Sequence, residues 1–321
     1  MRVYRTLEEV PGGKRVVAIG NFDGVHIGHQ RIITDAVKAA AKAGCRSMVI
    51  TFNPPPLAVI APAKSPPILT PLNIKIDLID QLGVDDLLII PFTKEFSRLP
   101  PEQFCRLLFG SKLGAVEVIV GSNFRFGFKA EGDIGFLKQF GKKAGMKVRG
   151  VPLVTSGGEP ISSTRIRNLL AAGNLEEVCG ILGRPPSTHG KVVHGEKRGR
   201  RLGVRTANIE ALMDCIFPGR GVYLADLYIG SDAYACLVNV GHNPTFCTTD
   251  EDVTQKIRIE AHILDFDRNL YGFNVRVDFL RRLRDEMKFD SPEELVAQIE
   301  KDIVAARRYK GFAARAKKVA K

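Results

Sequence analysis

The sequence lacks the features that mark membrane-spanning, secreted or metal-cluster proteins. Six cysteines occur in 321 residues, widely scattered and with no CxxC pair. This spacing argues against a zinc site and against a disulfide framework. The opening residues, MRVYRTLEEV, carry charges where a secretory signal needs an apolar run, and the longest apolar stretches, such as 87–92, are too short to span a bilayer. We expect a cytoplasmic protein with no membrane partner.

Motifs for nucleic-acid binding are also missing, although the formal net charge is +12. The chain has no Arg-rich recognition helix and no RNP-type aromatic motif. Part of the positive excess lies in the tail, from Arg307 to Lys321. A body that binds polyanionic nucleotides would account for the rest, because basicity alone reports only an electrostatic field. The sequence predicts no nucleic-acid partner.

Strands and helices alternate over residues 15 to about 182. Strands are predicted at 15–20, 46–52, 86–91, 116–120 and 147–154, and helices at 30–43, 73–82, 101–109, 134–143 and from about 164. A proline-rich loop follows the second strand, at 54–67. Strands separated by helices are typical of βαβ units and a mostly parallel sheet, in which ligands bind at the carboxyl ends of the strands.

Beyond Gly183 the pattern changes to a period of two. Apolar and polar residues alternate over 257–263 and 273–279, with glycine and proline between such segments. This indicates an antiparallel barrel or sandwich. The run Ser-Pro-Glu-Glu at 291–294 gives an N-cap, a proline at the first helical position and a capping-box glutamate, so a helix closes this part. We predict an α/β domain at 1–183 and an antiparallel β-barrel domain with a closing helix at 184–321.

One glycine-containing segment, GNFDGVHIGH at 20–29, leads from the first strand toward the first helix. A helix start offers unpaired backbone amides and the positive end of the helix dipole, which favour a phosphate. His26 and His29 are three residues apart, so they lie on one side of the first turn and can donate to phosphate oxygens. A second segment, ISSTRIR at 161–167, brings three hydroxyls and Arg165 to another helix start.

These segments, together with NFRFG at 123–127, resemble the nucleotidyltransferase module of prokaryotic bifunctional riboflavin kinase/FAD synthetases in order and spacing. The resemblance implies a Rossmann-like domain that adenylylates FMN with ATP to FAD. It also implies that Asn123 binds the flavin or metal end and that His29 and Arg165 are catalytic. The residues expected to bind the nucleotide here are Gly20, Phe22, Asp23, Gly24, His26, Gly28, His29, Ser162, Ser163, Thr164 and Arg165.

The second half resembles the riboflavin kinase module of the same family. The matching segments are GRP at 183–185, GKVVHG at 190–195, GRRLG at 199–203, TAN at 206–208, GRGVY at 219–223, NVGHNPTF at 239–246 and EAHI at 260–263. The resemblance implies phosphorylation of riboflavin to FMN, with ATP as co-substrate, Mg²⁺ as cofactor and Glu260 as catalytic base. Nucleotide binding is assigned in the same way to Gly190, Gly195, Thr206 and Asn208, and Mg²⁺ ligation to Thr206 and Asn208.

The two reactions differ in their need for a base. The phosphate of FMN is mostly dianionic at neutral pH, because its second pKa is about 6, so it can attack the α-phosphorus of ATP directly. Riboflavin attacks through a primary alcohol, whose pKa is nearer that of water, about 15.7, and needs a general base. Glu260 lies in the polar phase of an alternating strand, which alone would indicate a solvated face. The family pattern assigns the base to it.

Other classes of protein share parts of these patterns. HIGH at 26–29 is also the signature of class I aminoacyl-tRNA synthetases, but ISSTRIR stands where their lysine loop would be, and no anticodon-binding domain follows. A non-enzymatic RNA-binding barrel protein would retain RNA in a salt-sensitive way and show no turnover. The alternative that stays open is an FAD synthetase with an impaired kinase domain.

Two positions depart from the family pattern. Pro55 occupies a slot where the family usually carries a histidine, so no role of that histidine is transferred. Arg205 replaces the proline of a Pro-Thr-Ala-Asn motif, which restores a backbone N–H and adds a charge near the expected phosphates. We expect a working kinase because Thr206 and Asn208 are intact. Oligomeric state, kinetic constants, a need for reduced flavin and coupling between the two sites are left open.

Overall fold

The computed structural model describes residues 1–110, 112–194, 205–211, 215–242 and 257–309. The contact pattern divides the chain into two compact units, Met1–Ser163 and Thr164–Lys321. Within the described residues, no helix combines the length and the apolar character needed to cross a membrane.

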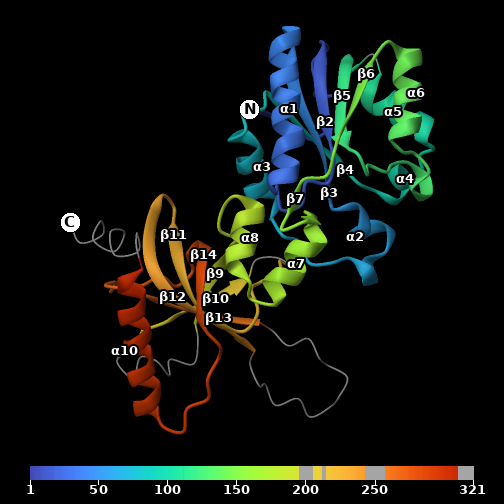
Figure 1. The fold of residues 1–321 in the computed structure, drawn as a ribbon. Coiled ribbons are helices and arrows are strands. Elements are labelled where there is room, and N and C mark those ends of the chain that lie inside the picture. The colour runs from blue at the N-terminus through green and yellow to red at the C-terminus, as the bar shows by residue number, and fades with distance from the viewer. Residues whose placement is uncertain (111, 195–204, 212–214, 243–256, 310–321) are drawn as a thin grey trace. The chain divides into compact units, whose positions relative to one another are not determined.

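The first unit is built on a six-stranded parallel sheet (Figure 1). The strand order is β1 (Arg2–Tyr4), β4 (Asp86–Pro91), β3 (Arg46–Asn53), β2 (Arg15–Ile19), β5 (Ala115–Gly121) and β6 (Lys147–Val151). Strand β2 pairs with β3 on one side and with β5 on the other. The strand order therefore reverses at β2, which makes the β2/β5 edge a topological switch point, the usual ligand position in such sheets. The predicted Rossmann-like class is confirmed.

Helices cover both faces of this sheet (Figure 1). On one face, α1 (Ile27–Ala43) and α3 (Leu72–Asp80) pack their apolar sides against the strands. On the other, α5 (Pro101–Phe109) and α6 (Ile134–Ala144) cover a second core, rich in phenylalanine. The sheet is thus buried on both sides, which accounts for strands such as VVAIG that read as continuous apolar runs.

Several boundaries differ from the sequence prediction. Helix α1 begins three residues before the predicted start at 30, because the side chain of His26 caps it. The predicted proline-rich loop contains the short helix α2 (Pro56–Ile60) and a 3-10 turn, both with proline in the first turn. The elements without a predicted counterpart are β1, α4 (Lys94–Ser97), the 3-10 turn η2 (Phe128–Ala130), and the two-residue strands β7 (Thr155–Ser156) and β8 (Glu159–Pro160). All are short, so they carry little periodic signal.

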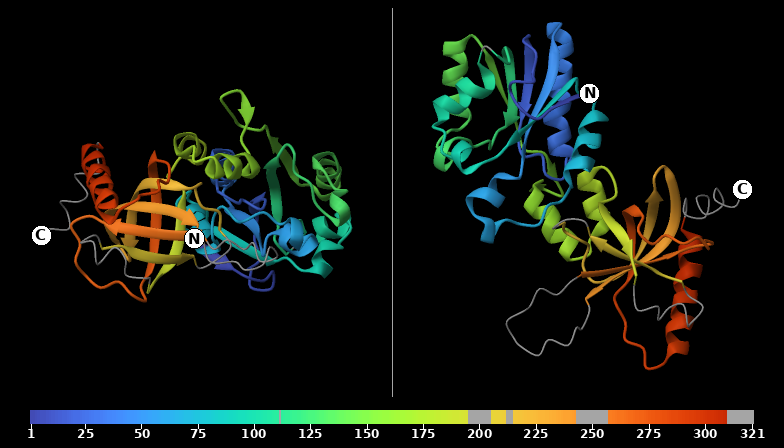
Figure 2. Two further views of the ribbon diagram at one scale, coloured as in Figure 1. Left: turned by 90° about the horizontal axis from the view of Figure 1, so that it is seen from below. Right: turned by 180° about the vertical axis from the view of Figure 1, so that it is seen from behind.

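The second unit is a closed antiparallel barrel preceded by two helices (Figure 2). Helices α7 (Ser163–Ala171) and α8 (Leu175–Leu182) lead into the barrel. Its strands, in spatial order, are β10 (Ala207–Ala211), β13 (Ile257–Ile263), β12 (Asp232–His242), β11 (Gly221–Ile229), β14 (Asn274–Arg284) and β9 (Ser187–Val193). Ile259, Ala261 and Ile263 are buried, whereas Glu260 and His262 alternate with them and are half-buried. The predicted barrel is confirmed.

The closing helix is α10 (Pro292–Arg308). The hydroxyl of Ser291 accepts from the backbone N–H of Glu294 at 3.2 Å, as the cap motif predicts. The Glu294 carboxylate returns to the N–H of Asp290, one residue earlier than the capping-box pattern expects. Buried Ala306 and half-buried Ile303 pack this helix onto a hydrophobic cluster of the barrel.

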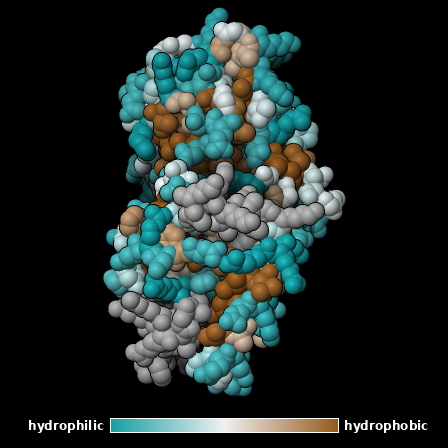
Figure 3. Space-filling model, turned by 90° about the vertical axis from the view of Figure 1, so that its left-hand side faces the viewer, coloured by the Kyte–Doolittle hydropathy of each residue, from teal (hydrophilic) through white to brown (hydrophobic). Residues whose placement is uncertain are grey.

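Figure 3 shows how hydrophobic and hydrophilic side chains are distributed on one face of the molecule. Among the residues coloured there, hydrophobic side chains gather in several separate groups between hydrophilic ones. Exposed large hydrophobic side chains include Leu57, Ile60, Phe273 and Met287. Single exposed apolar side chains of this kind are normal in folded proteins.

Candidate active sites

The first candidate site begins with a backbone under strain. The segment between β2 and α1 holds two non-glycine residues at positive φ, Phe22 at 48° and Val25 at 41°. A β-branched residue such as valine rarely adopts this conformation. Both side chains are almost completely buried in the core of α1 and the sheet, so packing imposes the conformation. Strain held in place by a core is typical of functional loops.

His26 and His29 are arranged by the start of α1. The Nδ1 atom of His26 accepts from the backbone N–H of His29 at 3.2 Å, which makes His26 the N-cap. In the neutral ring the proton is then on Nε2, which can donate. The two rings stack, with centroids 3.5 Å apart and planes 19° from parallel. A Cβ on Gly28 would lie 3.2 Å from the His26 ring, so glycine is favoured there.

The surroundings of His29 lower the pKa of its ring. Its Nδ1 atom is buried and has no hydrogen-bond partner among the described residues. The pKa of His29 is well below its ordinary value, first because burial disfavours the charged ring and then because of the positive charges of His26 and Lys75. His29 is therefore neutral at neutral pH, and one of its two ring nitrogens is a donor while the other is an acceptor.

Asp23 has a structural task that the sequence did not indicate. Its carboxylate accepts from the backbone N–H groups of Leu69, at 3.0 Å, and Thr70, at 3.2 Å. The side chain is buried, so these bonds tie the residues before α3 to the loop after β2. The backbone carbonyl of Asp23 in turn accepts from the hydroxyl of Ser163 at 2.9 Å. This last contact, within the first unit, holds Ser163 of the ISSTRIR segment beside the loop of the histidines.

The remaining predicted residues of this site lie at helix starts and strand ends. Asn123 is exposed and follows β5, the strand that pairs with β2 at the switch point. Ser162 is exposed at the start of α7. Thr164 and Arg165 belong to the second unit, where the Arg165 guanidinium pairs with Glu177 of α8. That ion pair was not predicted, because charge spacing across two helices carries no local signal. The roles of these residues in binding nucleotide stay predictions.

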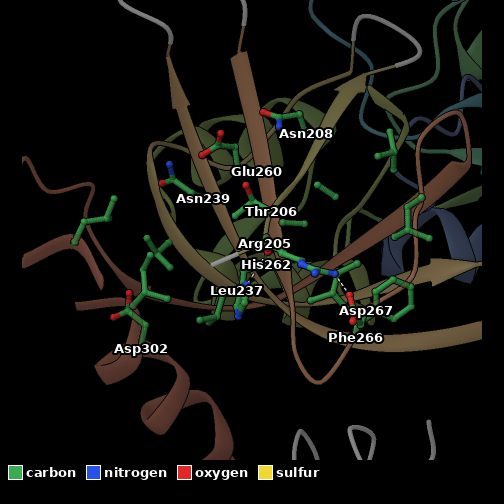
Figure 4. A pocket seen from close by; sticks show the side chains of 18 of the residues that line it. Arg205, Thr206, Asn208, Leu237, Asn239, Glu260, His262, Phe266, Asp267 and Asp302 are labelled. Carbon is green, nitrogen blue, oxygen red and sulfur yellow. Dashed lines mark hydrogen bonds and ion pairs between the residues drawn. The ribbon is translucent and has the colours of Figure 1, made fainter. Parts of the chain in front are cut away.

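The second candidate site is a cavity of about 620 Å³ on the barrel (Figure 4). Side chains from β10, β12 and β13 form one side of it, together with the connection after β13. The cavity is also lined by residues of other barrel strands, of the segment before α10 and of α10 itself: Val192, Val222, Arg284, Glu286, Met287, Phe289, Leu295, Ile299 and Asp302. Drug-sized ligands typically occupy cavities of about 300–1,000 Å³, so the volume suits a small molecule.

Three polar side chains form a row across neighbouring strands of this cavity. Glu260 on β13 lies directly opposite Asn208 on β10 and directly opposite Asn239 on β12. All three are half-buried, and Thr206 lies two residues before Asn208. Figure 4 shows these four side chains grouped together. The structure thus brings together three predicted residues and adds Asn239, which the sequence indicated only as the first letter of NVGHNPTF.

Arg205 has partners within the protein. Its guanidinium pairs with Asp267 in the connection after β13, and both side chains are exposed. Its backbone carbonyl lies 2.8 Å from Nδ1 of His262. Figure 4 shows Arg205, His262 and Asp267 in another part of the cavity from Glu260. Arg205 therefore connects the residues before β10 to those after β13.

An ion pair that the sequence did not indicate lines the opposite part of the cavity. Arg284, at the end of β14, donates from both Nε and Nη2 to the carboxylate of Asp302 on α10, at 2.8–3.1 Å. Gln298 donates to the same carboxylate at 2.9 Å. Asp302 is buried, so this network fixes α10 against the barrel beside the cavity. The partners are 18 residues apart, beyond any local pattern.

The two predicted nucleotide-binding glycines of this unit differ. Gly190 lies within β9, and a Cβ there would come 2.3 Å from the Ile209 side chain and 2.6 Å from the carbonyl of Glu210. Close packing of β9 against β10 therefore gives a structural reason for this glycine. Gly195 lies outside the described residues. Nucleotide binding by either glycine stays a prediction.

A parallel α/β unit with histidines at a helix start, joined to a barrel with a carboxylate-lined cavity, defines a two-domain nucleotide-dependent transferase. Family comparison agrees: the FAD synthetase family matches residues 10–165, and the riboflavin kinase family matches residues 182–310. The chain belongs to the family of bifunctional riboflavin kinase/FMN adenylyltransferases.

Relatives support this over nearly the whole length. The bifunctional riboflavin kinase/FMN adenylyltransferase of Listeria monocytogenes is 37% identical over 298 residues, covering 92% of this chain and 93% of the relative. The Bacillus subtilis protein of the same name is 36% identical over 299 residues, 92% of each chain. The crystal structure of a macrolide-efflux protein from Streptococcus pneumoniae has a TM-score of 0.85 at 32% identity, covering 96% of this chain and 99% of that one.

Proposed function

We propose that the chain converts riboflavin to FAD in two consecutive steps. The second unit phosphorylates riboflavin with ATP, which gives FMN, and the first unit adenylylates FMN with a second ATP, which gives FAD and pyrophosphate. The observation that carries the proposal is the row of Asn208, Glu260 and Asn239 in a cavity of about 620 Å³, within the match to riboflavin kinases. The histidine pair at the switch point of the first unit supports the second reaction.

In the kinase reaction, Glu260 acts as the general base. Its carboxylate accepts the proton of the primary alcohol of riboflavin, and the alcohol oxygen bonds to the γ-phosphorus of ATP while the bond from that phosphorus to ADP breaks. Glu260 suits this role because it is half-buried within the cavity. Asn208 on β10 and Asn239 on β12 flank the Glu260 side chain on its two sides.

The residues present fit Mg²⁺ at this site. Thr206 and Asn208 offer a hydroxyl and an amide oxygen that line the same cavity as the Glu260 carboxylate. Oxygen donors are the ligands of Mg²⁺, which usually takes one or two from the protein and the rest from phosphates and water. No cluster of three or more His, Cys, Asp or Glu side chains suited to a metal was found among the described residues. The ion would neutralise charge on the transferred phosphoryl group.

In the adenylylation reaction, the first unit aligns reactants and needs no base. The FMN phosphate attacks the α-phosphorus of ATP, and the bond to pyrophosphate breaks. His26 can donate from Nε2, and neutral His29 can donate from one ring nitrogen, to phosphate oxygens on which charge develops. Ser162, Ser163, Thr164 and Arg165 complete the phosphate contacts, and Asn123 contacts the flavin or metal end.

The domain boundary at 183/184 and a cytoplasmic location are parts of the same proposal. Gly183 ends α8 in the left-handed conformation, and the riboflavin kinase match begins at 182. The contact division instead falls after Ser163, so α7 and α8 pack with the barrel. A reducing compartment agrees with the five described cysteines, which are free thiols.

One assay tests the proposal. Purified protein is incubated with riboflavin, ATP and Mg²⁺, and the flavins are resolved by chromatography over time. We expect FMN first and FAD later, and neither product when EDTA is present. Accumulation of FAD only from supplied FMN would identify an FAD synthetase with an impaired kinase. No product from either flavin would contradict both assignments.

A further inference from the structure

Lys75 is a charged side chain buried behind the histidine loop, and neither proposed reaction uses it. It lies on α3, is 4% exposed, and donates from Nζ to the backbone carbonyl of Asn21 at 2.9 Å. The hydroxyl of Thr51 donates to the same carbonyl at 3.1 Å. Burying an ammonium group is costly unless it is paired or has a function.

The position of Lys75 links it to the strained segment. Asn21 directly precedes Phe22, the first residue at positive φ, and lies five positions before the capping histidine His26. Hydrogen bonds to the backbone between β2 and α1 add to the core packing that holds this conformation. Lys75 and Thr51 anchor the carbonyl of Asn21, and Asp23 anchors the next turn through the backbone of Leu69.

Lys75 also brings a positive charge to the histidines. The charged or titratable groups that interact electrostatically with His29 or with Lys75 are His26 at the cap of α1 and Asp23 in the loop, and Lys75 on α3 itself acts on His29. Burial lowers the pKa of Lys75, and the negative charge of Asp23 partly opposes this effect. Asp23 is itself held by two backbone N–H groups. The hydrogen bond to the Asn21 carbonyl holds the amino group of Lys75 at the loop.

We propose that Lys75 is a positioning residue of the adenylyl-transfer site, whose buried ammonium anchors the Asn21–His26 segment and supplies a fixed positive charge behind it. The proposal rests on the assignment of FMN adenylylation to this unit. The charge of Lys75 adds to the burial that keeps His29 neutral before a nucleotide binds, and it favours the polyphosphate once the nucleotide is bound.

Two variants distinguish the hydrogen bond of Lys75 to the Asn21 carbonyl from the positive charge of Lys75. Lys75→Met removes both the donor and the charge at similar volume, whereas Lys75→Gln keeps a donor and removes the charge. Lys42→Met, on the exposed side of α1, is the matched control. We expect FMN adenylylation by Lys75→Met to fall by roughly 10–100-fold, the usual range for a residue that orients a contacting group. Riboflavin phosphorylation by the same preparation should stay within about twofold of native, as the kinase residues are elsewhere in the chain.

The second measurement follows the ring of His29 by NMR, without substrate, from pH 4 to 8, with His29→Asn to assign its signal. We expect the native midpoint below the ordinary value of about 6.5, and a higher midpoint in both Lys75 variants but not in Lys42→Met. A merely structural lysine would not move this midpoint selectively.

The outcomes are distinct. An adenylylation rate within about twofold of native in Lys75→Met would contradict the anchoring role of Lys75. An unchanged His29 midpoint in Lys75→Gln would contradict its electrostatic role. If Lys75→Met fails to fold, Lys75→Gln and the native midpoint still decide, because a native midpoint at or above about 6.5 contradicts the proposal. Failure of the assigned function would instead appear as no FAD from the native protein.

Discussion

The two candidate sites are built in different ways. In the first unit, the histidine loop follows β2, Asn123 follows the adjacent parallel strand β5, and Ser163 donates a hydrogen bond to the carbonyl of Asp23 in the histidine loop. In the second, the polar row comes from three strands, and the rest of the cavity from the residues before α10 and from α10 itself. A loop site depends on local backbone conformation, whereas a barrel site depends on strand register. The two sites should therefore respond differently to mutation, and each reaction serves as the control for the other.

The largest expected effect is that of Glu260→Gln on the kinase. The substitution keeps the shape of the side chain and removes its basicity, so riboflavin phosphorylation should fall by roughly 10²–10⁴-fold. Adenylylation of supplied FMN should be unchanged, because Glu260 belongs to the barrel. Steady-state assays with each flavin separately measure both. A variant that phosphorylates riboflavin normally would show that Glu260 is not the base.

His29→Ala is the reverse experiment. Loss of one donor near developing charge should reduce FAD formation from FMN by roughly 10²–10³-fold. FMN formation from riboflavin should survive, because His29 lies in the first unit. His26 should keep its cap bond, which uses the backbone of residue 29 rather than its ring. Near-normal FAD synthesis in this variant would remove His29 from the proposed site.

Truncation tests where the barrel unit begins. We predict that fragment 184–321 folds and retains kinase activity, as the change of sequence period near 183 suggests. Helix α8, however, contacts β14 and buries four apolar side chains: Leu175, Val178, Ile181 and Leu182. Fragment 164–321 should therefore melt several °C higher, since each kcal/mol changes the Tm of a domain of this size by roughly 2–4 °C. Equal melting temperatures would place the functional boundary at 183/184.

The smallest effect is expected at Arg205. Its pair with Asp267 is solvent-exposed, so it should contribute only about 0.2–1 kcal/mol to stability. If Arg205 contacts a phosphate, Arg205→Ala should raise the KM for ATP several-fold, and Asp267→Asn should lower it by freeing the guanidinium. Arg205→Pro tests the family residue at this position. Equal KM values for ATP in the native protein and the three variants would show that Arg205 does not contact the nucleotide.

The same contrast governs how much could be predicted from the sequence. The parallel sheet, the barrel and the histidine segment all have local signals: buried runs, alternation with period two, and a glycine-rich stretch before a helix. The structure brings Ser163 to the loop of Asp23, as the paired segments predicted. The buried contacts of Asp23, Lys75 and Asp302 had no such signal. Each joins residues at least 18 positions apart, so only the folded chain brings them together.

The polar row also constrains how this protein can change over evolutionary time. Side chains alternate with period two, so an insertion of one residue in β13 before Glu260 would move the carboxylate to the buried face of the strand and out of line with Asn208 and Asn239. A closed barrel has no free edge to absorb the slip, because β13 is paired on both sides. Insertions and deletions should therefore be confined to the connections between strands, while β10, β12 and β13 diverge by substitution alone. The site of the first unit does not depend on strand register. Its loops can therefore change length outside the residues that the hydrogen bonds of Asp23 and Lys75 hold in place.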